Sequence, residues 1–86
     1  MEINFFGSVS KFTNGEKSTE IKDCKILREA VEELGAHYGK RFKNFLLSDE
    51  TCFILVNGKG VKMTGGLDTK LEPCDKIEVL PFTEAG

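Results

Sequence analysis

The 86-residue sequence has no tryptophan, one histidine and three cysteines. An iron–sulfur cluster needs four thiolates with short local spacings, and Cys24, Cys52 and Cys74 meet neither requirement. An odd number of widely spaced cysteines is also unlike the disulfide framework of a small secreted protein. We therefore expect reduced thiols and no bound metal or cofactor, with Cys52 as a small core residue in an apolar strand.

Long apolar runs and an excess of positive charge are also missing. No segment approaches the roughly 20 apolar residues of a membrane helix, and the opening "MEINFFGSVSKF" lacks the basic start of a secretion signal. These absences predict a cytoplasmic protein. The net charge of -2 argues against nucleic acid as a partner. We interpret the one basic cluster, Lys40, Arg41 and Lys43, as a solvated loop, with a docking patch for an acidic partner as the alternative.

A recognisable set of catalytic residues is absent as well. His37 lies near the end of a predicted helix, and no neighbouring pattern marks a nucleophile or an orienting acid. The glycines of "MTGGLD" lack the lysine of a phosphate-binding loop. The chain is therefore not expected to be an enzyme on its own.

The first third of the sequence predicts a hairpin followed by a helix. Segment 2–12 alternates apolar and polar residues as a half-buried strand does, Asn14-Gly15 suits a tight turn, and a second strand follows through Thr19 and Ile21. Apolar residues then recur at three- and four-residue steps over 25–38, which predicts an amphipathic helix. We expect Asp23 as its N-cap and Gly39 as its stop, with Gly35 costing about 1 kcal/mol relative to alanine.

The remaining segments complete an α+β pattern. "KRFKNFLLSDE" (40–50) is less regular, whereas 52–56 predicts a central strand that ends in an Asn57-Gly58 turn. Segment 64–75 predicts a loop or short helical turn held by Leu67 and Leu71, and 76–82 predicts the last strand. One main helix on one face of a mixed sheet is the β-grasp arrangement of ubiquitin-like proteins. A ferredoxin-like arrangement is the alternative, but it requires a second helix in 64–75.

Strand alternation predicts an apolar outer face on this sheet. The inward set is Ile3, Phe5, Ile54, Val56, Ile77 and Val79, and the outward set is Phe6, Phe53, Leu55 and Leu80. We interpret the outward set as a partner-binding surface, with Phe82 holding the exit of the tail. The alternative is that "FLLSDE" folds over part of it.

Four motifs occupy the last third of the chain. They are "VNG" at 56–58, "GGLDT" at 65–69 with Leu71 soon after, "DKIEV" from Asp75, and "LP" at 80–81 shortly before a terminal glycine. Together they resemble the MoaD/ThiS family of small sulfur carriers, most closely its molybdopterin synthase branch. The order and length of the earlier elements agree with that family.

The resemblance implies a carrier that works through its C-terminus. In the family the terminal carboxylate is adenylated by a ubiquitin-activating-type enzyme, which uses ATP, and is then converted to a thiocarboxylate. By resemblance, Gly86 would carry the sulfur and Ala85 would stand at the penultimate position. The implied partners are the activating adenylyltransferase and the molybdopterin synthase large subunit. A thiamine-pathway carrier would use the same terminal chemistry.

The predicted division is a domain over 1–81 and a flexible tail over 82–86. The five residues after Pro81 can span roughly 15–18 Å, far enough to enter a partner's buried site. The family ends in Gly-Gly, whereas Ala85 adds a methyl group that disfavours positive φ and thickens the tail. The alternative function is therefore a β-grasp binding module or protein modifier without sulfur transfer.

Overall fold

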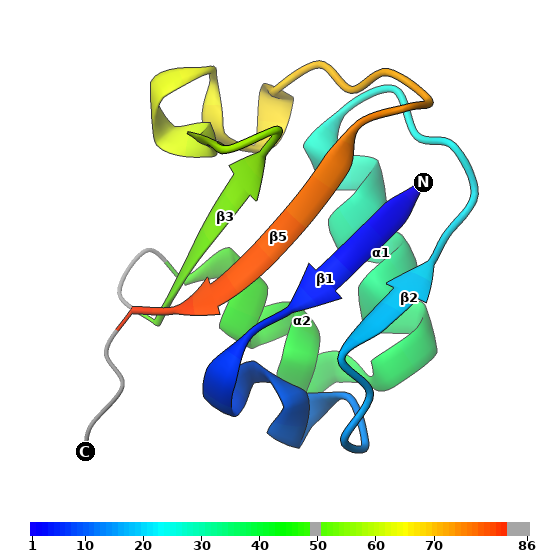
Figure 1. Cartoon of the computed structure of the whole chain (residues 1–86), viewed down its shortest axis with the longest axis vertical. Coiled ribbons are helices and arrows are strands. Elements are labelled where there is room, and N and C mark those ends of the chain that lie inside the picture. Colours follow the sequence, from blue (N-terminus) through cyan, green and yellow to red (C-terminus); the bar gives the residue numbers. More distant parts are fainter. Residues whose placement is uncertain (49–50, 83–86) are drawn as a thin grey trace.

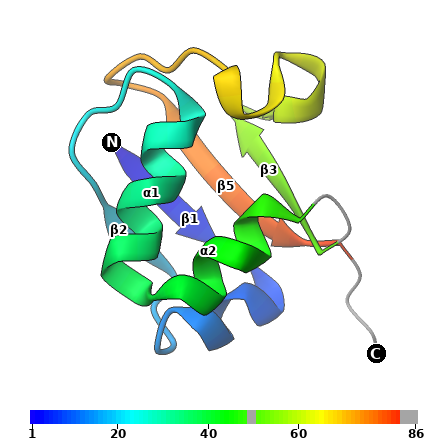
Figure 2. The same ribbon diagram turned by 180° about the vertical axis from the view of Figure 1, so that it is seen from behind.

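The computed structural model describes residues 1–48 and 51–82, and within them five strands form one mixed sheet. The strand order is β2-β1-β5-β3-β4. Both helices lie on one face of this sheet (Figure 1), as the view from behind also shows (Figure 2). The elements are β1 (Glu2–Phe5), β2 (Ser18–Glu20), α1 (Leu27–Tyr38), α2 (Lys40–Leu47), β3 (Cys52–Val56), β4 (Lys59–Gly60) and β5 (Lys76–Pro81), with 3-10 helices η1 (Gly7–Phe12), η2 (Val61–Met63) and η3 (Gly66–Asp68).

The last strand, β5, lies in the middle of the sheet. It pairs in parallel with β1, which places Ile3 beside Ile77, and antiparallel with β3, which places Ile54 beside Val79. The alternation prediction is confirmed, because all six residues expected to point inward are buried: Ile3, Phe5, Ile54, Val56, Ile77 and Val79. The predicted α+β, β-grasp arrangement is therefore present.

The helical layer differs from the prediction in one respect, because "KRFKNFLLSDE" is not an irregular stretch throughout. Residues 40–47 form α2, whose Phe42 is fully buried and whose Leu46 is almost so. The basic cluster consequently lies on a helix rather than in a loop, and the Lys43 ammonium lies 2.7 Å from the Glu32 carboxylate of α1. A second helix here does not make the fold ferredoxin-like, because it directly follows α1 and precedes β3.

The first strand is shorter than predicted. β1 ends at Phe5, since Gly7 has a φ of 58° and turns the chain into η1, where Val9 is buried as expected. The Asn14-Gly15 turn is present, with φ angles of 56° and 83°. It connects η1 to β2 rather than one strand directly to the next.

The start of α1 is held by backbone contacts and not by the predicted cap. The helix begins at Leu27, four residues after Asp23, and the Asp23 carboxylate instead lies 3.5 Å from the N-terminal ammonium of Met1. The Leu27 N–H donates to the Thr69 carbonyl at 2.9 Å. The predicted stop at Gly39 is confirmed, with a φ of 109°.

Gly35 allows α1 and α2 to approach each other closely. A Cβ at this position would lie 2.9 Å from the Cβ of Lys43, closer than two such atoms normally come. The propensity cost predicted for this glycine is therefore offset by the helix contact that it permits.

We predict that Gly35→Ala lowers the free energy of unfolding by about 1–3 kcal/mol, because the added methyl group forces the two helices apart. Denaturant unfolding measures this change. The matched control is Ala36→Gly at the next, exposed helix position, which should cost about 1 kcal/mol through propensity alone. A Gly35→Ala protein that is more stable than the parent would contradict the close contact.

Candidate functional site

An apolar row crosses the open face of the sheet near the end of β5. Phe53 of β3 lies opposite Leu80 of β5, and the N–H of Phe6 donates to the Val79 carbonyl at 3.0 Å, which places Phe6 beside Leu80 on the other side. Phe6 is 43% exposed and Phe53 41% exposed, although both are large apolar residues. We call Phe6, Leu80 and Phe53 the apolar row.

The neighbouring row across the same strands is more polar. Asn4 lies beside Glu78, and Glu78 lies opposite Leu55, which is half-buried. The apolar surface is thus concentrated at the end of the sheet where β5 leaves it. An apolar area rimmed by charged residues is typical of a protein interface.

The described part of "FLLSDE" does not cover the apolar row. Phe45 stacks on Phe12 with a ring separation of 4.6 Å, and Leu46 is buried in the core. Phe45 and Leu46 belong to α2, which lies on the face of the sheet opposite the apolar row (Figure 2). Residues 49–50, the rest of this alternative, lie outside the described residues.

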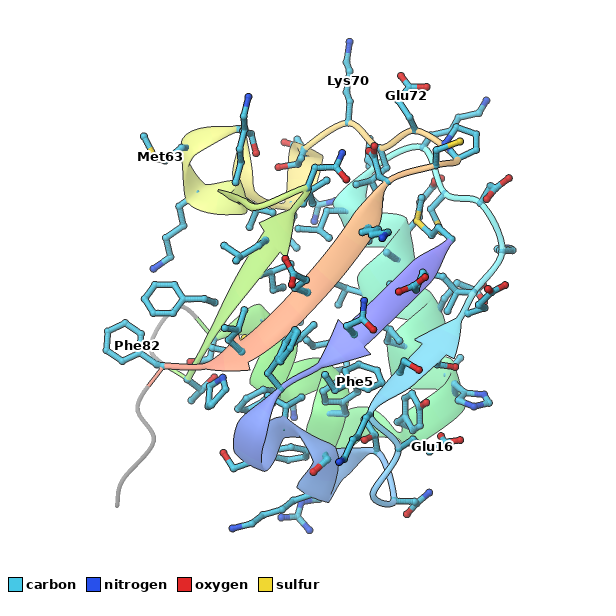
Figure 3. All side chains as sticks on the ribbon, viewed as in Figure 1. Phe5, Glu16, Met63, Lys70, Glu72 and Phe82 are labelled. Carbon is cyan, nitrogen blue, oxygen red and sulfur yellow. The ribbon has the colours of Figure 1, made fainter. Side chains whose placement is uncertain are left out.

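Phe82 continues the pairing of β5 with β3 and lies at the end of the described chain (Figure 3). Its N–H donates to the Thr51 carbonyl at 2.9 Å. Its ring stacks on Phe53, with centroids 4.9 Å apart and planes inclined by 25°. The first residue of the predicted tail is thus attached to β3 by a backbone and a side-chain contact.

Pro81 fits the strand end because no hydrogen bond is needed from its nitrogen. Val79 accepts from the Phe6 N–H, so by alternation the nitrogen of Pro81 also faces the β1 side. There the chain has already turned away at Gly7. Proline at the last position of a strand therefore costs no ladder bond.

Gly86 and Ala85, which the sequence predicts to carry the terminal chemistry, lie outside the described residues, so their roles stay predictions. Chain geometry alone limits the four residues 83–86 to a span of roughly 13–14 Å from Phe82.

Comparison with known proteins identifies the family. The model of the ThiS family matches residues 3–84. The chain belongs to the ThiS family. Members of this MoaD/ThiS group are small ubiquitin-like sulfur carriers and are generally not catalytic.

Solved structures share the fold of this chain. A chain of the BexX/CysO complex of Amycolatopsis orientalis is 24% identical, with a TM-score of 0.83 over 99% of this chain and 98% of that one. The small archaeal modifier protein 1 of Methanosarcina acetivorans is 20% identical, with a TM-score of 0.77 over 99% and 94%. A Pyrococcus furiosus protein described as molybdopterin converting factor subunit 1 is 21% identical, with a TM-score of 0.69 over 95% of each chain. No curated protein sequence matches the chain.

Two of the motif residues in this ThiS-family chain form a structural bridge. The Asn57 amide donates to one Asp75 oxygen at 2.7 Å, and its carbonyl accepts from the Lys76 N–H at 3.0 Å. The other Asp75 oxygen accepts from the Glu72 N–H at 2.8 Å. Asn57 also has a φ of 53°, which asparagine tolerates better than most residues. The bridge joins the β3–β4 turn to the start of β5, at the opposite end of the sheet from the tail.

The "GGLDT" motif is also structural in this chain. Thr69 is buried, and its hydroxyl donates to the Gly66 carbonyl at 2.6 Å and lies 3.0 Å from the Thr64 hydroxyl. Its own carbonyl accepts from Leu27 and so holds the start of α1. Sequence reasoning expected a turn here but missed the contact with the helix.

The remaining candidate groups do not form a reactive site. Cys24 and Cys52 are buried and Cys74 is exposed, and burial raises the pKa of the Cys24 thiol. The His37 ring stands edge-on to Tyr38 at 4.6 Å. Among residues 1–48 and 51–82, no three His, Cys, Asp or Glu side chains are grouped as metal ligands. No helix in that part of the chain is long and apolar enough to cross a membrane.

We predict that Asp75→Ala lowers the free energy of unfolding by about 1–2 kcal/mol, because it removes two hydrogen bonds. Asn57→Gly should cost a similar amount while preserving the positive φ, and the double variant should cost less than the sum. Asn14→Gly, at the other Asn-Gly turn with a φ of 56°, is the matched control and should change stability little. If the changes in the free energy of unfolding caused by the two substitutions were strictly additive, Asn57 and Asp75 would not form a bridge.

We predict that the three thiols of the folded protein react at very different rates. Cys74 should be alkylated rapidly, whereas burial of Cys24 and Cys52 excludes the reagent and disfavours the Cys24 thiolate. Mass spectrometry after timed iodoacetamide treatment measures the order, and unfolding in denaturant should equalise the rates. Equal rates in the folded state would contradict the burial.

Proposed function

We propose that the chain is a sulfur carrier of the molybdopterin synthase small-subunit type. In this proposal the Gly86 carboxylate is adenylated and then converted to a thiocarboxylate, which donates sulfur in molybdenum- or tungsten-pterin cofactor synthesis. The proposed partners are a ubiquitin-activating-type adenylyltransferase and a synthase large subunit. The family assignment supports carrier chemistry, and the four motifs of the last third favour the molybdopterin branch.

The observation that carries the proposal is the position of the apolar row beside the end of β5. A partner that binds the row covers Phe53 and Leu80, and Phe82 lies against Phe53 at a ring separation of 4.9 Å. The tail then starts at the edge of the bound partner. The four residues after Phe82 span at most roughly 13–14 Å, so docking of the sheet face would let the terminal carboxylate reach that far into the partner.

The terminal chemistry explains why such a carrier needs partners. A free α-carboxylate has a pKa of about 3.3–3.7, so it is ionised at neutral pH and is a poor electrophile. In the proposed sequence, one carboxylate oxygen attacks the α-phosphorus of ATP on the activating enzyme and pyrophosphate leaves. A sulfur nucleophile then attacks the acyl carbon and AMP leaves. This chain contributes the carboxylate and the docking surface.

Ala85 favours a second candidate function, a protein modifier or binding module without sulfur transfer. Alanine disfavours the positive φ that a penultimate glycine adopts freely. One structural neighbour is itself named as a modifier protein. A modifier would use the same adenylate but transfer the acyl group to an amine, so the fate of the activated carboxylate separates the two functions.

We predict that incubation with a ThiS/MoaD-type activating enzyme, ATP and a sulfur donor replaces one oxygen of Gly86 by sulfur. Intact-mass analysis followed by sequencing of the C-terminal peptide detects the exchange. Ala85→Gly should react at least as fast as the parent, and deletion of Gly86 should abolish the product. The test should be run with the exposed-surface variant Lys70→Ala as a control, because Lys70 is exposed on the segment before β5, away from Phe82 (Figure 3).

Two results would count against the proposed function. In the first, the parent forms no adenylate although Ala85→Gly reacts, which would support a binding module. In the second, the parent forms an adenylate but gives only an amide-linked product, which would support a protein modifier.

A further inference from the structure

The contact between Phe82 and β3 has two parts that act on the same residue. The backbone part is the 2.9 Å hydrogen bond from the Phe82 N–H to the Thr51 carbonyl, one position beyond the Cys52–Pro81 pair of the ladder. The side-chain part is the stack of Phe82 on Phe53. Together they extend the pairing of β5 with β3 by one residue past the end of the strand.

The fold does not need this contact for its core. Phe53 is 41% exposed and Phe82 48% exposed, and both rings lie outside the set of buried core residues. A stacked aromatic pair favours the associated arrangement by only about 2- to 12-fold beyond its buried area. A preference of this size is too small to hold a domain together, but it is large enough to determine where the tail starts.

We infer that Phe53 is a positioning residue for the C-terminal tail, because through Phe82 it fixes the point from which residues 83–86 begin. The inference rests on the proposed function, since only a reacting terminus makes the starting point matter. Four residues reach roughly 13–14 Å from a fixed Phe82. A tail released from Phe53 would start nearer the sheet centre and search a larger volume, which lowers the effective concentration of its carboxylate at the partner's reactive site.

The first test needs no partner and measures amide hydrogen exchange at Phe82 in the isolated protein. We expect protection in the parent, and a loss of protection by about 2- to 12-fold in Phe53→Ala. Phe6→Ala, which truncates the other aromatic of the apolar row, should leave the Phe82 amide unchanged. An unprotected Phe82 amide in the parent, or an equal effect of the two variants, would overturn the inference.

The second test separates docking from delivery in the adenylation reaction. Phe6→Ala should raise KM and leave kcat unchanged, since it weakens docking alone. Phe53→Ala should also lower kcat by about 2- to 12-fold, and Phe53→Tyr, which keeps the ring, should restore kcat. Phe82→Ala should show the same fall in kcat, with no further fall in the Phe53→Ala/Phe82→Ala double variant. If Phe53→Ala raises KM and leaves kcat unchanged, Phe53 is only a docking residue, and the positioning role is overturned.

The two tests distinguish failure of this inference from failure of the proposed function. If the parent is never adenylated, the proposed function fails, and amide exchange still decides whether Phe53 holds Phe82. If the parent is adenylated and Phe53→Ala has the parent's kcat, the positioning role fails while the carrier function stands.

Discussion

The hydrogen bonds that pair β5 with strands on both of its sides determine where the chain leaves the sheet. They hold the last strand of the chain in the middle of the sheet, parallel to β1 and antiparallel to β3. The chain must therefore leave the sheet from its centre, beside the apolar row and past the start of β3. The apolar row and Phe82, the first residue of the predicted tail, are neighbours for this reason.

The two ends of the sheet have different roles. At one end the Asn57–Asp75 bridge and the buried Thr69 hold the β3–β4 turn and the start of α1. At the other end the exposed Phe53 and Phe82 lie beside the half-buried Leu80, next to the predicted tail. Most of the motif residues by which the sequence resembles its family are therefore structural, and the proposed chemistry belongs to a terminus with little sequence signal of its own.

Period-two alternation predicted the sheet well, because a strand with one buried face leaves no freedom in which side chains point inward. It identified the six buried positions and the exposed Phe6 and Phe53. The helix α2 was missed because eight residues give only two buried positions, Phe42 and Leu46, too few to establish a period. The early end of β1 follows from the positive φ of Gly7, which the alternating pattern of 2–12 does not reveal. The close approach of α1 and α2 at Gly35 is a tertiary contact, which local sequence patterns do not contain.

We propose that the terminal carboxylate of this ThiS-family chain carries sulfur. The most direct measurement is the mass of the C-terminal peptide of the protein isolated from its own cells under conditions that preserve thioacids. We predict a population in which one oxygen of Gly86 is replaced by sulfur, and which reverts to the carboxylate on hydrolysis. A terminus found only as the carboxylate, or only in amide linkage to other proteins, would contradict it.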